Sequence, residues 1–221
     1  MIKYAVFDMD GTLLDTEKIF RSTWLDTSKK WGMDDADTFY GEICGRNTYK
    51  IREIFFEHYG DKYDFEKFFL ERNTLFIDII KRDGVPVKEG CFELLEYLRE
   101  QGIPCALATS TPMKLVEHNM SVTGIGKYMS AIVTGDMVEN GKPAPDIFIE
   151  AGKRIGAEPC ECMVLEDSFN GLRGARAAGM IPIMIIDGMR PDDEIKSITR
   201  AQCESLYEVL DTVKKINSED I

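Results

Sequence analysis

The sequence is poor in histidine, with two in 221 residues, and none of its six cysteines forms a Cys-x-x-Cys pair. The closest cysteines, Cys160 and Cys162, lack the partner spacing of a zinc site, so no structural zinc is expected. No apolar run approaches the roughly 20 residues of a membrane span, and the one at the start is too short for a signal peptide. We therefore expect a cytoplasmic protein with reduced thiols.

Positive charge is also scarce, because 27 Lys and Arg face 39 Asp and Glu, which gives a formal net charge of −12. Such a surface repels phosphate backbones and anionic lipids, so neither nucleic acid nor a membrane is an expected partner. The 44% hydrophobic and 30% charged residues are typical of a soluble globular protein. A phosphate site in this protein would need a local cation, either a metal ion or a lysine, to overcome the overall charge.

Several motifs of nucleotide-binding proteins and serine hydrolases are missing. Neither G-x-G-x-x-G nor G-x-S-x-G occurs in the chain. Residues 135–142 resemble a P-loop, but five residues separate the two glycines and a proline follows the lysine, where serine or threonine is required. These classes are therefore not expected.

What the sequence does contain, after residue 84, is an alternation of helical patterns and short apolar runs. This alternation predicts parallel strands joined by right-handed crossovers, an α/β fold with a doubly wound parallel sheet and a Rossmann-like core. The predicted strands are 4–7, 103–108, 131–134, 163–165 and 181–186. The predicted helices are 91–98, 113–120, 146–155, 169–178 and a closing helix around 206–213.

The stretch from Thr16 to about Arg82 has a different pattern, because its apolar residues recur at three- and four-residue steps and no strand interrupts it. We predict an all-helical cap domain, 16–82, inserted after the first strand. The α/β catalytic core then consists of 1–15 and 83–221, with hinges near 14–17 and 81–87.

Polar residues follow four of the predicted strands, at the points where these strands end. In open α/β sheets, ligands bind beyond the carboxyl ends of the strands, so these residues are expected to converge on one site. They are the Asp8–Thr12 string, the Thr109–Thr111 string, the run around Lys142, and Glu166 with Asp167 and Ser168.

Asp8 and Asp10 stand two residues apart, and Gly11 allows the sharp turn that would point both carboxylates into one space. Two carboxylates so close repel each other unless a cation neutralises them. An oxygen-only ligand set without histidine favours Mg²⁺ over zinc. Glu166 and Asp167 supply the further carboxylates that such a site needs.

Thr109 and Ser110 precede Pro112, which suits the first turn of a helix. Hydroxyls and backbone N–H groups there can bind an anion, although an ordinary N-cap is the favoured interpretation when these two residues are taken alone. Lys142 lies in a loop between a glycine and a proline. It is either a solvated surface lysine or the cation that balances the carboxylates and a substrate phosphate.

These residues together resemble the haloacid dehalogenase-like hydrolase superfamily, in particular its β-phosphoglucomutase-like phosphatases with a helical cap. The resemblance spans nearly the whole chain and rests on four motifs in order: Asp8-Met9-Asp10-Gly11-Thr12, Thr109, Lys142 in Gly-Lys-Pro-Ala-Pro-Asp, and Glu166-Asp167. It implies a phosphoric monoester hydrolase.

The resemblance also implies a role for each motif. Asp8 would be the nucleophile that forms an aspartyl-phosphate, and Asp10 would protonate the leaving oxygen and then activate water. Mg²⁺ would bind the Asp8 carboxylate, the Asp10 backbone carbonyl and Asp167, with Glu166 either binding it directly or holding its ligands. The residues that would bind the transferring phosphoryl group are Thr109, the amide of Ser110, and Lys142.

Three functions remain open at this point. Within the superfamily that this sequence resembles, the dehalogenases carry Tyr at the position of Asp10 and the phosphonate-cleaving members carry Ala. Neither has an acid there, so Asp10 favours phosphoryl transfer. The resemblance places Phe20 and Thr48 at the positions where the mutases of the group have a cap-side histidine and an arginine that binds the second phosphate. We therefore favour a phosphatase over a hexose-phosphate mutase of the β-phosphoglucomutase type. The third alternative, a non-catalytic metal-binding regulator, is opposed by the intact motifs.

The expected partner is a small-molecule phosphate ester, by default a phosphorylated sugar or polyol. Selectivity is expected to come from cap residues that close over the leaving group. The candidates are Arg46, Asn47 and Lys50, in or beside a loop between cap helices. The expected oligomeric state is a monomer.

Overall fold

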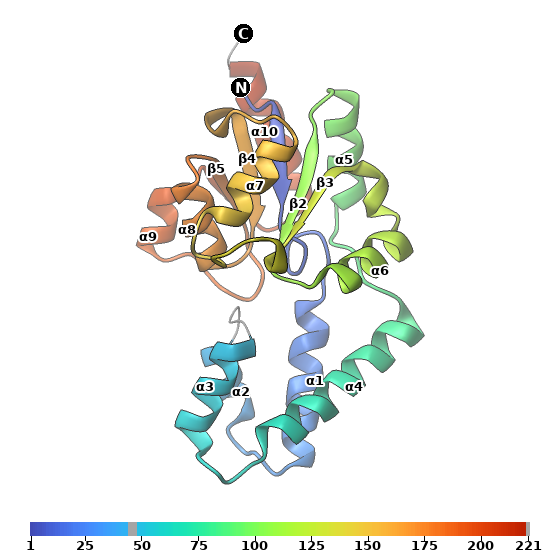
Figure 1. The fold of residues 1–221 in the computed structure, drawn as a ribbon, viewed down its shortest axis with the longest axis vertical. Coiled ribbons are helices and arrows are strands. Elements are labelled where there is room, and N and C mark those ends of the chain that lie inside the picture. The colour runs from blue at the N-terminus through green and yellow to red at the C-terminus, as the bar shows by residue number, and fades with distance from the viewer. Residues whose placement is uncertain (44–47, 220–221) are drawn as a thin grey trace. The chain divides into compact units, whose positions relative to one another are not determined.

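The computed structural model describes residues 1–43 and 48–219 of the chain. The chain divides into two compact units, one formed by Met1–Asp15 with Pro86–Ile221 and the other by Thr16–Val85. We call them the core unit and the helical unit. Figure 1 shows the sheet and its helices in the first, and only helices in the second.

The core unit contains one sheet of six parallel strands in the order β3-β2-β1-β4-β5-β6. The strands are β1 Tyr4–Phe7, β2 Cys105–Thr109, β3 Met129–Thr134, β4 Cys162–Glu166, β5 Ile181–Ile185 and β6 Ala201–Cys203. The prediction of a doubly wound parallel sheet is thereby confirmed. β1 lies between β2 and β4, where the strand order reverses, and ligands bind at such switch points.

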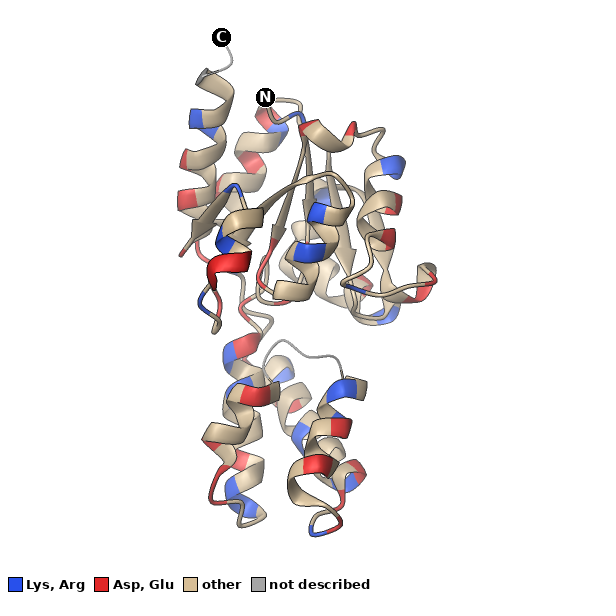
Figure 2. Cartoon of the chain, turned by 90° about the vertical axis from the view of Figure 1, so that its left-hand side faces the viewer, with Lys and Arg blue, Asp and Glu red and all other residues tan. Residues whose placement is uncertain are grey.

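The α-helices of the core unit are α5 Cys91–Glu100, α6 Met113–Thr123, α7 Asp146–Arg154, α8 Phe169–Ala177, α9 Asp193–Ile198 and α10 Leu206–Glu219. Three short 3₁₀ helices occur at Ile125–Tyr128, Gly135–Met137 and Pro159–Glu161. Side chains of α7 and α8 join those of the central strands in one buried cluster that includes Val6, Ala106, Val164, Phe148 and Ala175. The strands carry almost no charged residues (Figure 2), as expected of a parallel sheet covered on both faces.

Two elements, β6 and α9, were not among the predicted ones. β6 has only three residues and α9 only six, which is too short for a hydrophobic period to be visible in the sequence. α9 begins instead on a local signal, because the side chain of Asp192 accepts a hydrogen bond from Ile195 N at 2.8 Å.

The helical unit contains α1 Glu17–Lys30, α2 Ala36–Ile43, α3 Thr48–Tyr59 and α4 Phe65–Asp83. Its interior is largely aromatic, and the rings of Trp24 and Phe68 meet edge to face with centroids 4.9 Å apart. α4 begins at a capping Asp64, whose side chain accepts from Lys67 N at 3.1 Å. None of the helices within the described ranges is both long and apolar enough to cross a membrane.

Candidate active site

Asp8 lies directly beyond β1, at the point where the strand order reverses. Its backbone N–H donates to Leu165 O at 2.9 Å, which fixes it beside the end of β4. The chain then turns back at Gly11, which has a φ of +76°. A Cβ atom at Gly11 would collide with the carboxylate of Asp167, so glycine is needed there both for its backbone conformation and for space.

Lys142 extends from the loop after β3 into this site. Its side chain is only 8% exposed, and its ammonium group has three acceptors. Nζ lies 2.5 Å from Asp8 Oδ1, 2.7 Å from Glu166 Oε1 and 3.2 Å from Ala108 O. Each ammonium hydrogen therefore has an acceptor, and the alternative of a solvated surface lysine is wrong.

Glu166, the last residue of β4, is buried and accepts hydrogen bonds at both carboxyl oxygens. Oε1 accepts from Lys142, and Oε2 accepts from the backbone N–H of Ser168 at 2.6 Å and from its hydroxyl at 2.8 Å. A Cβ atom at Gly171, in the first turn of α8, would collide with this carboxylate. Sequence reasoning assigned no role to Gly171, although a glycine inside a helical pattern is a signal of close packing.

Asp8, Glu166 and Asp167 each offer a carboxylate oxygen, and these oxygens all lie within 4.8 Å of one another. With all three carboxyl groups ionised and Lys142 as the adjacent cation, this group would carry two net negative charges. The oxygen-only donor set and that surplus charge fit a dication such as Mg²⁺. The carboxylate of Asp10 is not in this group, since Thr111 Oγ1 donates to Asp10 Oδ2 at 2.7 Å.

Burial first, and repulsion between the carboxylates second, raise the pKa values of two of these carboxyl groups. Burial raises the pKa of Asp8 to about 7, against the lowering effect of Lys142 and with a further rise from Glu166. Burial also raises the pKa of Asp167 well above its ordinary value, and the charges of Glu166 and Asp8 add to that rise. For Lys142, burial alone would lower the pKa, but Asp8 and Glu166 outweigh it and raise the pKa.

Thr109 is the last residue of β2, and Ser110 follows it at the same edge of the sheet. Thr109 is buried, and its hydroxyl accepts from the backbone N–H of Thr111 at 3.1 Å. α6 starts only at Met113, with Pro112 at its N-cap position and no side-chain capping bond. The interpretation of these two residues as an ordinary N-cap is therefore wrong, and their role in anion binding stays a prediction.

The chain matches the haloacid dehalogenase-like hydrolase family over residues 2–179. It belongs to that family. Among curated relatives of this hydrolase, the "Phosphorylated carbohydrates phosphatase" of Thermotoga maritima is 30% identical over 180 residues, covering 80% of this chain and 81% of the relative. The "Probable pseudouridine-5'-phosphatase" of Drosophila melanogaster is 31% identical over 194 residues, covering 84% and 82%.

A solved structure described as a putative beta-phosphoglucomutase from Thermotoga maritima superposes on the hydrolase with a TM-score of 0.79. It is 25% identical and covers 97% of this chain and 100% of the other. These comparisons confirm the predicted superfamily. They also confirm the prediction of an enzyme of the phosphoric monoester hydrolase class.

Of the cap residues singled out in the sequence of this hydrolase, Lys50 lies on α3 and pairs with Glu53 Oε2 at 2.9 Å. Arg46 and Asn47 lie outside the described residues. Phe20, predicted to correspond to the mutase histidine, lies on α1, and the guanidinium carbon of Arg72 lies 3.3 Å from its ring centroid. Thr48 is the first residue of α3.

Arg72 of α4 is the polar residue of the helical unit that sequence reasoning missed. It is 3% exposed, and its Nη1 donates a hydrogen bond to Asn73 Oδ1 at 2.8 Å. Nε and Nη2 have no hydrogen-bond partner within residues 1–43 and 48–219. Burial lowers the pKa of this guanidinium to about 9, although Tyr40 and Glu17 act in the opposite direction. In an aromatic-rich helical pattern, an arginine is ordinarily expected on the solvent face.

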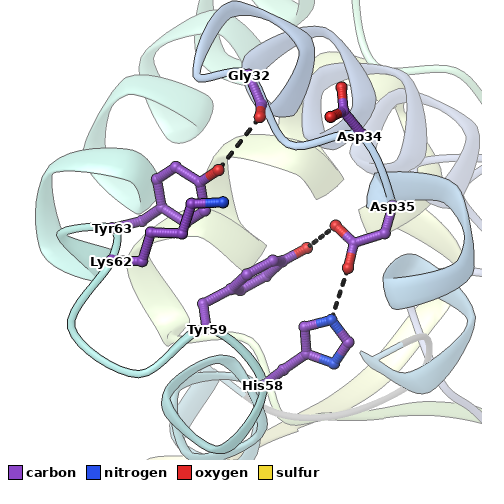
Figure 3. A pocket seen from close by; sticks show the side chains of 7 residues that line it. All are labelled: Gly32, Asp34, Asp35, His58, Tyr59, Lys62 and Tyr63. Atoms are coloured by element: carbon purple, nitrogen blue, oxygen red, sulfur yellow. Dashed lines mark hydrogen bonds and ion pairs between the residues drawn. The ribbon is translucent and has the colours of Figure 1, made fainter.

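The helical unit also contains a pocket of about 300 Å³ that is lined mainly by polar side chains, among them Asp35, His58 and Tyr59 (Figure 3). Asp35 accepts from Tyr59 at 2.8 Å and lies 2.6 Å from His58 Nε2, while Tyr63 donates to Gly32 O at 3.2 Å. These bonds join α3 and the residues after it to the turn between α1 and α2. His58 thus has a structural contact.

Proposed function

We propose that this hydrolase removes phosphate from a small phosphorylated sugar or polyol through an aspartyl-phosphate on Asp8, with Mg²⁺ as cofactor. The observation that carries the proposal is the buried group formed by Asp8, Lys142, Glu166 and Asp167 at the switch point of the sheet. The names of the two curated relatives, a phosphatase of phosphorylated carbohydrates and a phosphatase of pseudouridine 5'-phosphate, support this substrate class.

In the first half of the proposed reaction, a carboxylate oxygen of Asp8 attacks phosphorus and the bond from phosphorus to the leaving oxygen breaks. Asp10 gives its proton to that oxygen, so the product leaves as an alcohol. In the second half, water attacks phosphorus and passes a proton to Asp10. The bond between phosphorus and Asp8 breaks, which returns the free carboxylate and releases inorganic phosphate.

Lys142 has two functions in this scheme. It holds Asp8 in place through the 2.5 Å contact, and its charge favours the approach of an anionic phosphoryl group to an anionic nucleophile. Thr109 and the Ser110 amide would bind phosphoryl oxygens. When bound by Asp8, Asp167 and the Asp10 carbonyl, Mg²⁺ would stabilise the charge that develops on the phosphoryl oxygens.

The helical unit is proposed to act as the cap that selects the leaving group. Arg46, Asn47 and Lys50 remain candidates for this contact. Arg72 is a further candidate, because a buried guanidinium with two N–H groups lacking described partners is suited to an oxygen-rich ligand. A hydroxyl-rich sugar or polyol phosphate offers such oxygens.

A hexose-phosphate mutase of the β-phosphoglucomutase type is the second candidate, favoured by the solved structure that carries this description. Phenylalanine at position 20 weakens the mutase proposal, because a phenyl ring has no polar atom with which to restrain Asp10 as the mutase histidine does. The ring of Phe20 packs against Arg72 instead. A non-catalytic metal-binding regulator is the third, and it requires the site to be idle.

Phosphorus NMR of the purified protein with Mg²⁺ separates the three. The samples contain β-glucose 1-phosphate with a trace of glucose 1,6-bisphosphate, and then glucose 6-phosphate, fructose 1-phosphate and glycerol 3-phosphate. Inorganic phosphate supports the phosphatase, glucose 6-phosphate formed from the first sample supports the mutase, and binding of Mg²⁺ without turnover of any ester supports the regulator. Asp8→Asn should abolish turnover with an unchanged circular dichroism spectrum, and surviving activity would exclude the covalent mechanism.

The remaining parts of the proposal concern the state of the protein. We propose that the protein is a monomer, and that it is cytoplasmic, which the free thiols of five cysteines, four of them buried, support among the described residues. Sedimentation equilibrium at micromolar concentration tests the first part, and the distribution of the protein after cell fractionation tests the second.

A further inference from the structure

Asp10, to which the proposed function assigns both proton transfers, is held by a hydroxyl from a distant part of the chain. Thr111 Oγ1 donates to Asp10 Oδ2 at 2.7 Å, across 101 positions of sequence. Asp10 follows β1 and Thr111 follows β2, and these strands are hydrogen-bonded neighbours. Both residues belong to the core unit, so the bond is internal to that unit.

Thr111 is itself fixed by its surroundings. Its backbone N–H donates to the hydroxyl of the buried Thr109 at 3.1 Å. Pro112 follows it, and a residue before proline is restricted to extended conformations. The side chain therefore starts from a constrained backbone. Because Thr111 is held in this way, its hydroxyl determines where the carboxyl group of Asp10 lies.

A threonine hydroxyl has one hydrogen to donate, and this one is donated to Oδ2 of Asp10. Oδ2 is thus engaged as the acceptor of a bond that restrains the carboxyl group. We propose that Thr111 is the positioning residue of Asp10, because its hydroxyl holds this carboxyl group in the orientation in which it exchanges a proton with the leaving oxygen and then with water. The inference rests on the proposed function, in which Asp10 is the acid and the base.

This assignment explains how Asp10 is oriented in a chain with phenylalanine at position 20. A restraint supplied by the core unit acts in both halves of the reaction, before and after the leaving group departs. It keeps the Asp10 carboxylate in position to accept a proton from the attacking water once the aspartyl-phosphate has formed.

The test compares Thr111→Val, which keeps the shape and removes the donor, with Thr111→Ser, which keeps the donor. Thr123→Val is the matched control, because that hydroxyl bonds to Asn119 O within α6 and touches no site residue. For each protein, kcat/KM is measured with Mg²⁺ on p-nitrophenyl phosphate and on the alkyl phosphate that the wild type hydrolyses fastest in the panel above. p-Nitrophenolate leaves readily without a proton, whereas an alkoxide does not.

We expect Thr111→Val to lower kcat/KM at least about tenfold on the alkyl phosphate and less than about threefold on p-nitrophenyl phosphate, since misplaced general acids cost this much or more. Thr111→Ser should restore most of the loss, and Thr123→Val should match the wild type. An equal loss on both substrates, or no rescue by serine, overturns the inference. Should the valine variant not fold, Thr111→Cys, a weak donor of similar size, takes its place with the same expectations.

The two proposals fail in different ways. If the wild type hydrolyses both esters and Thr111→Val does so equally well, the positioning role is wrong and the proposed function stands. If the wild type hydrolyses neither ester, the proposed function fails and the role of Thr111 fails with it.

Discussion

The core unit and the helical unit both contain a buried cation, and the two have different surroundings. Lys142 of the core unit has three acceptors, of which two are the carboxylates of Asp8 and Glu166. Arg72 of the helical unit donates a hydrogen bond to Asn73 and lies against the rings of Phe20 and Phe76. One buried charge is fully paired, whereas the other retains N–H groups without a described partner.

The difference shows which unit has a completed site. A buried charge with good partners is compatible with a stable fold, whereas an unpaired one costs several kcal/mol of desolvation. The carboxylates around Lys142 are thus held in place by the fold itself. In the helical unit, Nε and Nη2 of Arg72 lack a described acceptor. The oxygen atoms of a sugar or polyol phosphate would supply acceptors for them. The following substitutions test this contrast.

Lys142→Met should have the largest effect. It leaves Asp8, Glu166 and Asp167 buried without their cation, so we expect the free energy of unfolding in EDTA to fall by about 3 kcal/mol. Phosphatase activity should fall by about 10²–10³-fold, because a preorganised donor to the reacting group is lost. Urea denaturation and steady-state kinetics measure the two. Unchanged stability in EDTA would show that the carboxylates simply take up protons.

Arg72→Met should change stability in the opposite direction. Removing an incompletely paired buried charge is expected to raise the free energy of unfolding by about 1–2 kcal/mol. The loss of a charged donor to the leaving group should lower kcat/KM by about 10–100-fold. Arg72→Lys, which keeps the charge without the planar fork, serves as the control. A variant that is less stable and fully active would mean that stacking on Phe20 is the only role of Arg72.

Two glycine-to-alanine substitutions, one in each unit, compare how tightly the two units are packed around a glycine. Gly171→Ala in α8 places a Cβ atom against the carboxylate of Glu166, so we expect a loss of about 1–3 kcal/mol of stability. Gly41→Ala in α2 meets no described atom within 4 Å, and alanine favours helices, so we expect a gain of about 0.5–1 kcal/mol. Thermal unfolding measures both. Equal effects would show that the collision is relieved by a simple movement of Glu166.

Asp35→Asn should have the smallest effect, and it depends on pH. Hydrogen bonds from His58 and Tyr59 lower the pKa of Asp35 below its ordinary 3.8. The ionised group therefore stabilises the fold above that value, and this contribution is lost as the pH falls through the lowered pKa. We expect the variant to melt about 1–2 °C below the wild type at neutral pH, as for an exposed pair, and the difference to shrink as the pH falls below 3.8 and through the lowered pKa of Asp35. Asp34→Asn is the control for the change in charge. A difference that persists in acid would contradict an electrostatic origin.

Prediction from sequence worked best where the signal is local. The strand β1 coincides with the predicted 4–7, and the acidic residues after β1 and β4 were found because an apolar run that ends on a carboxylate is visible in the sequence. It failed for β6 and α9, which are too short to show a period. Arg72 was missed because its burial depends on rings from other turns and another helix.

The sequence by itself therefore determined the α/β class, the family, and the residues that converge at the carboxyl edge of the sheet. It could do so because hydrophobic periods mark the strands, and parallel strands bring their ends to one edge. Only the tertiary structure decided that Lys142 joins Asp8 to Glu166, that Gly171 makes room for that carboxylate, and that Thr111 holds Asp10. These contacts join residues far apart in the chain, and the partner of a polar atom is chosen by what the folded backbone brings within hydrogen-bonding distance.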